Sequence, residues 1–413
     1  MSFNQPTEAA MSDHRFEKPL GADDAYYDIP LESGTIDMDD LRGQSVFHGE
    51  KRAREASKRY AIPENAAGAE CVDAIAQRIL GLLVMSRYRR GPVSFVSDAQ
   101  PQFLSKIRAA ILADRPVELV LSFFGSKVQN ALKTFSKNGT EVDVSELASL
   151  LRFYEITQAI EAMYPPGAVF HVACDGRKYA DAIGFTPEQG RGYYENIALM
   201  CRFLGIDHAV RLFDEADHYP HDLDERTQRH HERVRSSYAG GDPAVTRFVT
   251  KLRASMCLSM PINTSEIDLC RLRLAFSQCC DDELNRSDPK AFEIRRHLLD
   301  QSEKSAIRYI AIYDAVKETG VLERVAPDAI RATVHPKPGQ LGIYAVNQHA
   351  NDVFPHHGQG TIRGSADAVD IEKVRVGFRA DLERMGEGIR GVTLAKDHYP
   401  FVSENHPFFI ETV

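Results

Sequence analysis

The chain has 413 residues and a formal net charge of −9, from 50 Lys and Arg residues and 59 Asp and Glu residues. Hydrophobic residues make up 43% of it and charged residues 26%, which is typical of a globular protein long enough for two domains. This balance argues against general nucleic-acid binding, because phosphate backbones require clustered Lys and Arg. The apolar runs are strand-sized, well short of the roughly 20 residues that span a bilayer, and the N-terminus lacks a signal-peptide core. We therefore expect a cytoplasmic protein that contacts neither nucleic acid nor membrane.

Several familiar signatures are missing from the sequence. The seven cysteines show no CxxC spacing and their number is odd, so we predict reduced, packed thiols. There is no HxH or HExxH pattern to indicate a metal site. Walker A, GxGxxG and GxSxG motifs are also absent, which argues against P-loop NTPases, standard dinucleotide dehydrogenases and serine hydrolases.

The first part of the chain predicts an arm, a helix and a βαβ unit. Residues 1–60 are polar and weakly periodic, and we predict an arm that is partly disordered or lies over the core. Residues 71–85 have apolar residues at helical spacing and predict the first well-packed helix. Residues 93–96 and 117–124 are predicted to be strands buried on both faces, as in a parallel sheet. A helix over residues 101–113 would complete the βαβ unit.

The next region predicts a capped helix followed by a strand. Apolar residues recur on one face of residues 143–164, and Asp143 and Glu146 have the spacing of a capping box. The sequence PPG at 165–167 ends this helix, because proline cannot continue it and glycine turns freely. The apolar run 168–174 (AVFHVAC) is then predicted to be a strand.

The remainder alternates at first and then becomes mostly helical. We predict a helix over residues 187–204, a strand over 208–213, a charged helix over 222–237 and mostly helical structure over 242–320. The segments AIRATVH and LGIYAVN flank the turn sequence PKPG. They are predicted to form a hairpin that opens a C-terminal subdomain.

Two predicted strands end in polar segments, and ligands of open α/β sheets bind at the carboxyl ends of strands. The first segment, GSKVQNALK, follows the strand over 117–124. Lys127, Asn130 and Lys133 are three residues apart and would share a face if the segment enters a helix, where they could bind a phosphate or carboxylate. The alternative is a solvated basic helix face.

The second segment, DGRKYAD, follows the strand over 168–174. Arg177 can hold a carboxylate or phosphate through two parallel hydrogen bonds. Asp175 can act as a general base or orient a substrate amine, and Gly176 lets a ligand approach the backbone closely. The alternative is an Asp–Arg pair that closes a turn. Asp181 is better explained as a helix cap or a partner of Arg177 than as a catalyst.

Two of the histidines are candidates for proton transfer. His335 ends a predicted strand, and His356 follows Pro355 in a loop. His230 and His231 lie in a highly charged stretch and predict a solvated helix face.

The order of these motifs resembles the isocyanide (isonitrile) synthases of the pyoverdine/dityrosine biosynthesis family. KVQNALK at 127–133 fits the pattern Lys-x-x-Asn-x-x-Lys, and DVSE, a long helix, YPPGA and DGR follow in turn. AIRATVHP at 329–336 resembles the strand near the family's C-terminal part. The likeness covers roughly residues 115–215 and, more loosely, 325–360. The chain departs from the family at Val128-Gln129 (usually Ser-Pro), at Cys174 (usually a serine-type residue) and at Pro355-His356 (usually Trp-His).

The resemblance implies a modified Rossmann-like fold. Together with the element order, it predicts an α/β protein with a polar N-terminal arm over residues 1–60, a Rossmann-like core with a mostly parallel sheet and a helical insertion over residues 61–325, and a small C-terminal α+β subdomain over 326–413.

The resemblance also implies a lyase- or transferase-type enzyme of natural-product biosynthesis. Such an enzyme converts the amine of an amino acid into an isonitrile with ribulose 5-phosphate as carbon donor. The expected course is condensation with the sugar ketone, loss of phosphate and carbon–carbon cleavage. No cofactor or metal is implied, and the implied partner is a downstream iron oxygenase that uses 2-oxoglutarate. We also expect a small homo-oligomer.

The predicted catalytic residues are Lys127, Asp175 and His335. The predicted substrate- and phosphate-binding residues are Asn130, Lys133, Arg177 and His356. Glu146 is a weaker candidate, because a helix cap explains its position. Two alternatives stay open: a divergent family member that makes another product from an amino acid and a sugar phosphate, and a non-catalytic binding protein with the same fold, which could dispense with Asp175.

Overall fold

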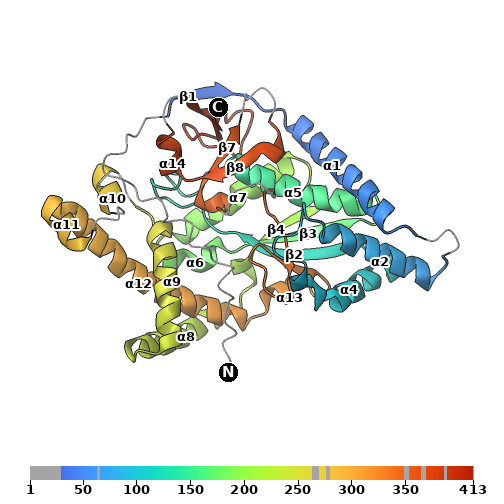
Figure 1. Ribbon diagram of the computed structural model, residues 1–413, viewed down its shortest axis with the longest axis horizontal. Coiled ribbons are helices and arrows are strands. Elements are labelled where there is room, and N and C mark those ends of the chain that lie inside the picture. The colour runs from blue at the N-terminus through green and yellow to red at the C-terminus, as the bar shows by residue number, and fades with distance from the viewer. Residues whose placement is uncertain are drawn as a thin grey trace.

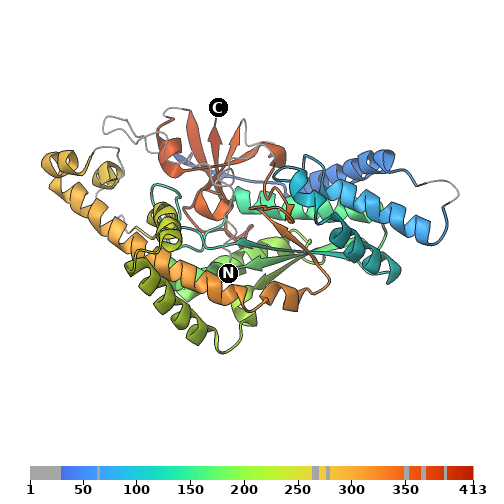
Figure 2. The same ribbon diagram turned by 60° about the horizontal axis from the view of Figure 1, so that its bottom comes forward.

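The computed structural model describes residues 29–62, 66–262, 269–275, 280–347, 353–363, 369–385 and 388–412. Within these ranges the chain forms two five-stranded sheets with helices packed around them (Figure 1). Figure 2 shows the C-terminal sheet on one side of the other sheet, and a long helical region that extends away from both. The predicted α/β class with a mostly parallel sheet is confirmed.

The core sheet has the strand order β4-β3-β2-β5-β6, and all its strand pairs are parallel. Its strands are β2 (Val117–Phe124), β3 (Ala168–Cys174), β4 (Val210–Asp214), β5 (Ile330–Thr333) and β6 (Leu341–Gly342). β2 and β3 are rich in Val, Leu and Phe and are almost entirely buried, as expected for strands covered on both faces. Both match the predicted strands residue for residue.

The predicted strand over residues 93–96 is wrong. Ser94–Ser97 form the short helix α3, and the amide of Phe95 donates to the carbonyl of Pro92 at 3.1 Å. Proline favours the start of a helix because its fixed φ is already helical, and a short apolar run does not distinguish a strand from a buried helix. The predicted βαβ unit that began at this strand is therefore absent.

The predicted hairpin around PKPG is also wrong. β5 and β6 pair in parallel, with Ala332 opposite Leu341, and β5 joins the core sheet beside β2. Gly342 lies against the backbone of Arg90, whose amide donates to the Gly342 carbonyl at 3.1 Å. A Cβ at Gly342 would lie 2.1 Å from the Arg90 carbonyl oxygen. β6 therefore packs tightly against the backbone of Arg90. The turn sequence alone does not indicate this contact or the parallel pairing with β5.

The core sheet is flanked by helices, and the hydrophobic pattern located four of them well: α2 (Ala69–Leu83), α4 (Gln100–Leu112), α5 (Val144–Glu161) and α7 (Pro187–Phe203). A further helix, α6 (Gly176–Ile183), was not predicted and follows β3 directly. The capping box predicted for α5 is confirmed, because the side chain of Asp143 accepts from the amide of Ser145 and Glu146 accepts from the amide of Asp143.

The N-terminal region contributes a strand and a long helix, although the first part of the predicted arm lies outside the described residues. β1 (Leu31–Gly34) is followed by α1 (Met38–Arg59). α1 packs along α5, and a Cβ at Gly49 would lie 2.9 Å from the carbonyl oxygen of Glu155. The close approach of the two helices is therefore possible only with a very small residue at this position.

A helical insertion follows β4, as predicted. It consists of α8 (Leu223–Ala239), α9 (Pro243–Ser259), α10 (Leu269–Ala275), α11 (Asp281–Ser287), α12 (Pro289–Lys317) and α13 (Val321–Val325). The long helix α12 packs against α8 and α9 and also against α6, which begins at the end of β3 (Figure 2). The insertion therefore reaches the carboxyl edge of the core sheet.

The second sheet has the order β1-β9-β10-β7-β8 and mixes parallel and antiparallel pairs. Its remaining strands are β7 (Gln359–Arg363), β8 (Val374–Gly377), β9 (Ile389–Leu394) and β10 (Phe409–Thr412). The short helices η3 (Pro355–His357), η4 (Ile371–Lys373) and α14 (Arg379–Glu383) connect to these strands. α5 contacts both this sheet and the core sheet, so it couples the two.

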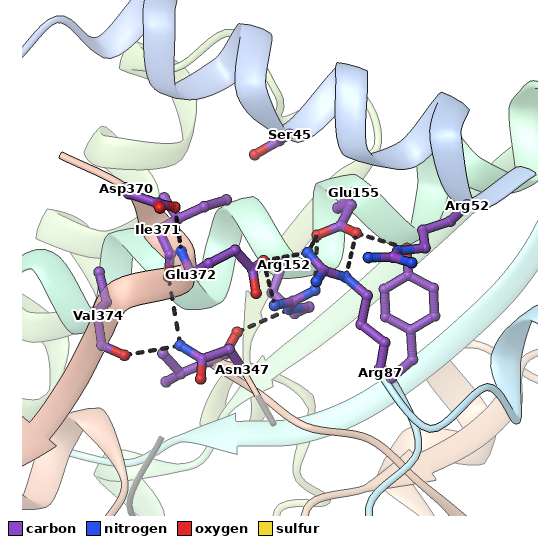
Figure 3. Close-up of polar contacts among 12 residues, drawn as sticks. Ser45, Arg52, Arg87, Arg152, Glu155, Asn347, Asp370, Ile371, Glu372 and Val374 are labelled. Atoms are coloured by element: carbon purple, nitrogen blue, oxygen red, sulfur yellow. Dashed lines mark hydrogen bonds and ion pairs between the residues drawn. The ribbon is translucent and has the colours of Figure 1, made fainter. Parts of the chain in front are cut away.

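A buried ionic cluster fastens the second sheet to α5 (Figure 3). The guanidinium of Arg152 donates to Glu155 at 2.8 Å and to Glu372 at 2.9 Å, and Arg87 donates to the same two carboxylates. The Arg152 side chain is 2% exposed, so loss of either carboxylate would leave its charge buried without full compensation. The cluster joins the segment before α3, helix α5 and η4. In the described part of the chain, no helix is long and apolar enough to cross a membrane.

Candidate functional site

The two polar segments that the sequence indicates meet at the carboxyl edge of the core sheet. The amide of Asp175 donates to the carbonyl of Phe124 at 2.9 Å. A Cβ at Gly176 would lie 2.4 Å from both the carbonyl oxygen of Gly125 and the hydroxyl of Ser126. Because β2 and β3 are parallel neighbours, the segments after them leave the sheet side by side. The two segments are therefore adjacent.

Lys127 is fully buried and its ammonium group has three acceptors. Nζ donates to Asp143 at 2.8 Å, to Glu146 at 2.9 Å and to the carbonyl of Pro355 at 2.8 Å. Burial lowers the pKa of Lys127, but the two carboxylates outweigh burial and the pKa lies above its ordinary value. An ammonium group has three hydrogens, and all are used here. Lys127 thus connects the segment after β2 to the start of α5 and to the residue before His356.

Of the two carboxylates around Lys127, Glu146 is the one whose pKa is raised, whereas that of Asp143 is lowered. One of its oxygens accepts from Lys127 and also from the hydroxyl of Tyr193 at 2.7 Å, and the other accepts from the amide of Asp143 at 2.8 Å. Burial and the neighbouring charge of Asp143 raise the pKa of Glu146 to about 7. Glu146 therefore combines its capping role with a buried charge network.

The condition for Lys127, Asn130 and Lys133 to share a helix face is not met, because the segment does not enter a helix. Residues 125–143 are all described and contain turns instead of a helix. The side-chain oxygen of Asn130 accepts from the amide of Leu132 at 3.0 Å, so Asn130 shapes this loop. Lys133 is 4% exposed, and its ammonium lies 5.5 Å from the ring centroid of Phe378.

Asp175 belongs to a group of charged and hydroxyl side chains that we call the acid cluster: Asp175, Lys178, Glu215 and Tyr219. The ammonium of Lys178 lies 3.2 Å from Glu215 and 3.8 Å from Asp175. Tyr219 donates to Glu215 at 2.8 Å. Burial raises the pKa of Asp175 to about 6, with Lys178 opposing this shift and Glu215 adding to it. Asp175 is therefore a carboxyl group that titrates close to neutral pH.

Sequence reasoning did not select Lys178, Glu215 or Tyr219. A signal was available, because Asp214 and Glu215 directly follow the predicted strand over 208–213, and that strand ends at the same edge of the sheet as β3. The same rule that selected Asp175 would have selected them.

Arg177 is held by two carboxylates, one from the last residue of β4 and one from the short helix η2 (Glu215–His218) that follows it. Its Nη1 donates to Asp214 at 2.9 Å and to Asp217 at 2.8 Å, and 21% of its side chain is exposed. Burial lowers the pKa of Arg177, but the hydrogen bonds to these two carboxylates outweigh burial, so the pKa lies above its ordinary value. Asp181 pairs with Arg308 at 2.6 Å and not with Arg177.

The two predicted histidines share an aromatic partner, and we call His335, Phe354 and His356 the histidine cluster. The ring of Phe354 stacks on His356 with centroids 5.7 Å apart and meets His335 edge-on at 4.8 Å. His335 is exposed, whereas His356 is buried against Gly125. Burial lowers the pKa of His356 to about 3, and the positive charges of Lys127 and Lys133 act in the same direction. His356 is therefore neutral at physiological pH.

The histidine cluster and the segment that carries Asp175 and Arg177 meet at Gly125. His356 packs on Gly125 from the histidine cluster, and Gly176, next to Asp175 and Arg177, contacts the same glycine. A different pocket, of about 70 Å³, lies at the amino end of β2 and is lined by Lys106, Arg115, Val117, Glu118 and Asp328 among others. Ligands of parallel sheets bind at the carboxyl edge, so we place the candidate site there. Among the described residues, no three His, Cys, Asp or Glu side chains gather in a metal-binding arrangement.

Fold and site together define an α/β protein whose polar residues converge on the carboxyl edge of a parallel sheet. Residues 107–374, well over half of the chain, match the family described as pyoverdine/dityrosine biosynthesis protein. The chain belongs to this family, which confirms the resemblance seen in the motif order. All the predicted site residues lie inside the matched range.

Two curated relatives match parts of the chain. L-tryptophan isonitrile synthase AmbI2 from Fischerella ambigua is 28% identical over 116 residues, which is 28% of this chain and 34% of that protein. L-tyrosine isonitrile synthase from Xenorhabdus nematophila is 29% identical over 146 residues, 33% of this chain and 42% of that protein. The chain thus spans less than half the length of the relatives it matches.

A solved structure shows the same fold. The crystal structure of the PvcA protein from Pseudomonas aeruginosa matches with a TM-score of 0.57 and 18% identity, covering 82% of this chain and 100% of that one.

Proposed function

We propose that this protein is an isonitrile synthase that converts the amine of an amino acid into an isonitrile, with ribulose 5-phosphate as the donor of the new carbon. It would act as a lyase- or transferase-type enzyme in natural-product biosynthesis. The two curated relatives carry isonitrile synthase names, which supports this class of reaction. Their substrates make tryptophan and tyrosine the first amino acids to test.

The observation that carries the proposal is Asp175, a 23% exposed carboxylate at the carboxyl edge of the core sheet. The amine of an amino acid is largely an ammonium ion at neutral pH, and its nitrogen must lose a proton before it can attack a ketone. The raised pKa of Asp175, about 6, makes it a better acceptor for that proton than an ordinary carboxylate. The surrounding carboxylates also favour a positively charged amine.

After proton loss, the nitrogen bonds to the ketone carbon of the sugar, and water leaves to give an imine. Phosphate then departs with the electrons of its carbon–oxygen bond. Cleavage of both carbon–carbon bonds of the former ketone carbon leaves that carbon on the nitrogen and releases the other four sugar carbons as carbonyl compounds. Several of these steps need a proton donor. His335, exposed beside Phe354, is our candidate for that role.

The phosphate and the substrate carboxylate need donors, and we assign them to Arg177, Lys133, Asn130 and His356. Arg177 uses Nη1 for both of its carboxylate partners, so its partly exposed guanidinium has further N–H groups for an anion. Neutral His356 can donate or accept one hydrogen bond. We assign Lys127, whose hydrogens are all accepted by the protein, to holding the loop rather than to touching substrate.

The test is incubation with each amino acid and uniformly ¹³C-labelled ribulose 5-phosphate, followed by mass spectrometry. We expect a product that gains one labelled carbon and loses two hydrogens relative to the amino acid. Asp175→Asn, with its folded state checked by circular dichroism, is expected to form none. Omission of the sugar phosphate is the second control.

Other outcomes select between the alternatives. A labelled product of different mass supports a divergent family member. Binding of both compounds without consumption supports a non-catalytic protein of the same fold. If no amino acid is consumed or bound, the proposed function is wrong.

A further inference from the structure

Side chains from three neighbouring parallel strands meet around Asp175. Asp175 follows β3, Glu215 follows β4, and Ser122 on β2 lies within hydrogen-bonding reach of both carboxylates. Lys178, on the first turn of α6, places its ammonium between the carboxylates, 3.2 Å from Glu215 and 3.8 Å from Asp175. Neither Lys178 nor Glu215 has a role in the proposed reaction so far.

Exposure separates the three charged residues into one that can reach a ligand and two that cannot. The side chain of Asp175 is 23% exposed, whereas Lys178 is 8% and Glu215 only 2% exposed. Glu215 is also fixed from behind, because Tyr219 donates to it at 2.8 Å. Lys178 and Glu215 therefore face Asp175 from the protein side.

We propose that Lys178 and Glu215 are positioning residues that set the proton affinity of Asp175 through opposite charges. This rests on the proposed function only in taking Asp175 as the base for the substrate amine. The proton leaves the substrate ammonium, whose N–H bonding electrons stay on nitrogen, and binds to a carboxylate oxygen of Asp175. Lys178 keeps its proton and positive charge throughout, and Glu215 remains an unprotonated carboxylate.

The charge states of Lys178 and Glu215 fit the proposed roles, in which these two residues stay charged and Asp175 takes up the proton. Burial lowers the pKa of Lys178, but Glu215 and Asp175 outweigh it, so Lys178 stays positive. Burial raises the pKa of Glu215, but Lys178 and its hydrogen bonds outweigh it, so Glu215 stays negative. Asp175 is left as the member that titrates near neutral pH. The other titratable groups that face it are Cys174 on β3, Tyr179 on α6, Tyr219 after η2 and Tyr309 on α12.

The test uses a pair of variants with opposite expected signs. Glu215→Gln removes a negative charge but keeps an oxygen acceptor for Lys178 and Tyr219. It is expected to lower the pKa of Asp175 by about one unit. Lys178→Met removes the positive charge and is expected to raise this pKa by about one unit. Glu118→Gln, at the amino end of β2, is the matched control and is expected to change nothing.

Two readouts are recorded. The pKa of Asp175 is measured by ¹³C NMR of carboxyl-labelled aspartate, with the signal assigned from its loss in Asp175→Asn. The acidic midpoint of the pH profile of kcat/KM for isonitrile formation is expected to move by the same amount. If Lys178→Met does not fold, Glu215→Gln decides alone. An unchanged pKa of Asp175 in folded Glu215→Gln overturns the inference.

The two proposals fail in distinguishable ways. Opposite shifts of the Asp175 signal without any isonitrile product leave the inference standing and overturn the proposed function. Isonitrile formation with an unmoved acidic midpoint and an unmoved Asp175 signal in Glu215→Gln does the reverse.

Discussion

Lys127 and Glu146 form an ion pair, with Nζ 2.9 Å from Oε1, in which neither side chain reaches solvent. Asp143 shares the same ammonium at 2.8 Å, so the segment after β2 is fastened to the first turn of α5. Lys127 also donates to the carbonyl of Pro355, the residue before His356. The placement of the histidine cluster therefore depends on this buried charge group.

Lys127→Met is expected to lower the free energy of unfolding by about 3–5 kcal/mol, because it leaves two buried carboxylates without their cation. Urea unfolding followed by fluorescence or circular dichroism measures this change. Lys137→Met, at an exposed position of the same loop, is the control and is expected to change stability by less than about 0.5 kcal/mol. Equal urea midpoints for Lys127→Met and the parent protein would contradict the structural role.

Asp175→Asn is expected to abolish turnover and yet stabilise the protein at pH 7. Burial raises the pKa of Asp175 from 3.8 to about 6, so the folded state binds an additional proton between these values. The stabilisation from protonated Asp175 is present below about pH 4 and is lost as pH rises through about 6.

Asparagine resembles the protonated acid, so the gain at pH 7 should be on the order of 1–3 kcal/mol and should vanish below pH 4. Thermal unfolding at several pH values checks this. Asp181→Asn, whose carboxylate is exposed beside Arg308, is the control. If Asp175→Asn is less stable than the parent at pH 7, the carboxylate at position 175 does not have a raised pKa in the folded protein.

Local sequence signals were sufficient for the elements that define the site edge. The predicted bounds of β2 and β3 match the structure because continuous runs rich in Val, Leu and Phe are typical of strands buried on both faces. The predicted cap of α5 matches because Asp143 and Glu146 have the capping-box spacing. The prediction for residues 93–96 failed because a four-residue run after a proline, with three apolar residues, fits a helical turn as well as a strand.

The charge partners of the site residues were beyond local signals. Arg177 pairs with Asp214 and Asp217, more than thirty residues away, and the partners of Lys127 come from α5 and from Pro355. Which cations are neutralised therefore depends on strand order and on the packing of the second sheet. The sequence placed the right segments together, but it could not show that Lys127 is enclosed or that Lys178 and Glu215 flank Asp175.

Buried histidines are expected to destabilise the protein in mild acid. Burial lowers the pKa of His356 to about 3 and that of His406 to about 4, below the ordinary value of 6.5. The stability that these neutral rings contribute is present above pH 6.5 and is lost as pH falls toward 4.

Each histidine should contribute about 1 kcal/mol per pH unit in this window. His406→Gln should flatten the dependence of the free energy of unfolding on pH, whereas His398→Gln, at an exposed position, should not. Urea unfolding at pH 7 and pH 5 gives the comparison. The same slope in His406→Gln and the parent would show that the acid response has another origin.

Gly176→Ala is expected to separate the two loops of the candidate site. The position begins α6 and its φ is not positive, so alanine is compatible with the backbone and only the added methyl group matters. That methyl group would lie 2.4 Å from the carbonyl oxygen of Gly125, a rigid backbone atom, so the segments must move apart. We expect a stability loss of about 1–3 kcal/mol and at least a tenfold lower kcat/KM for isonitrile formation.

Gly43→Ala is the matched control, because a Cβ at this exposed position of α1 meets no atom within 4 Å and alanine favours a helix. Full activity and unchanged stability in Gly176→Ala would mean that the contact between the loops is not needed, and the candidate site would have to be placed elsewhere.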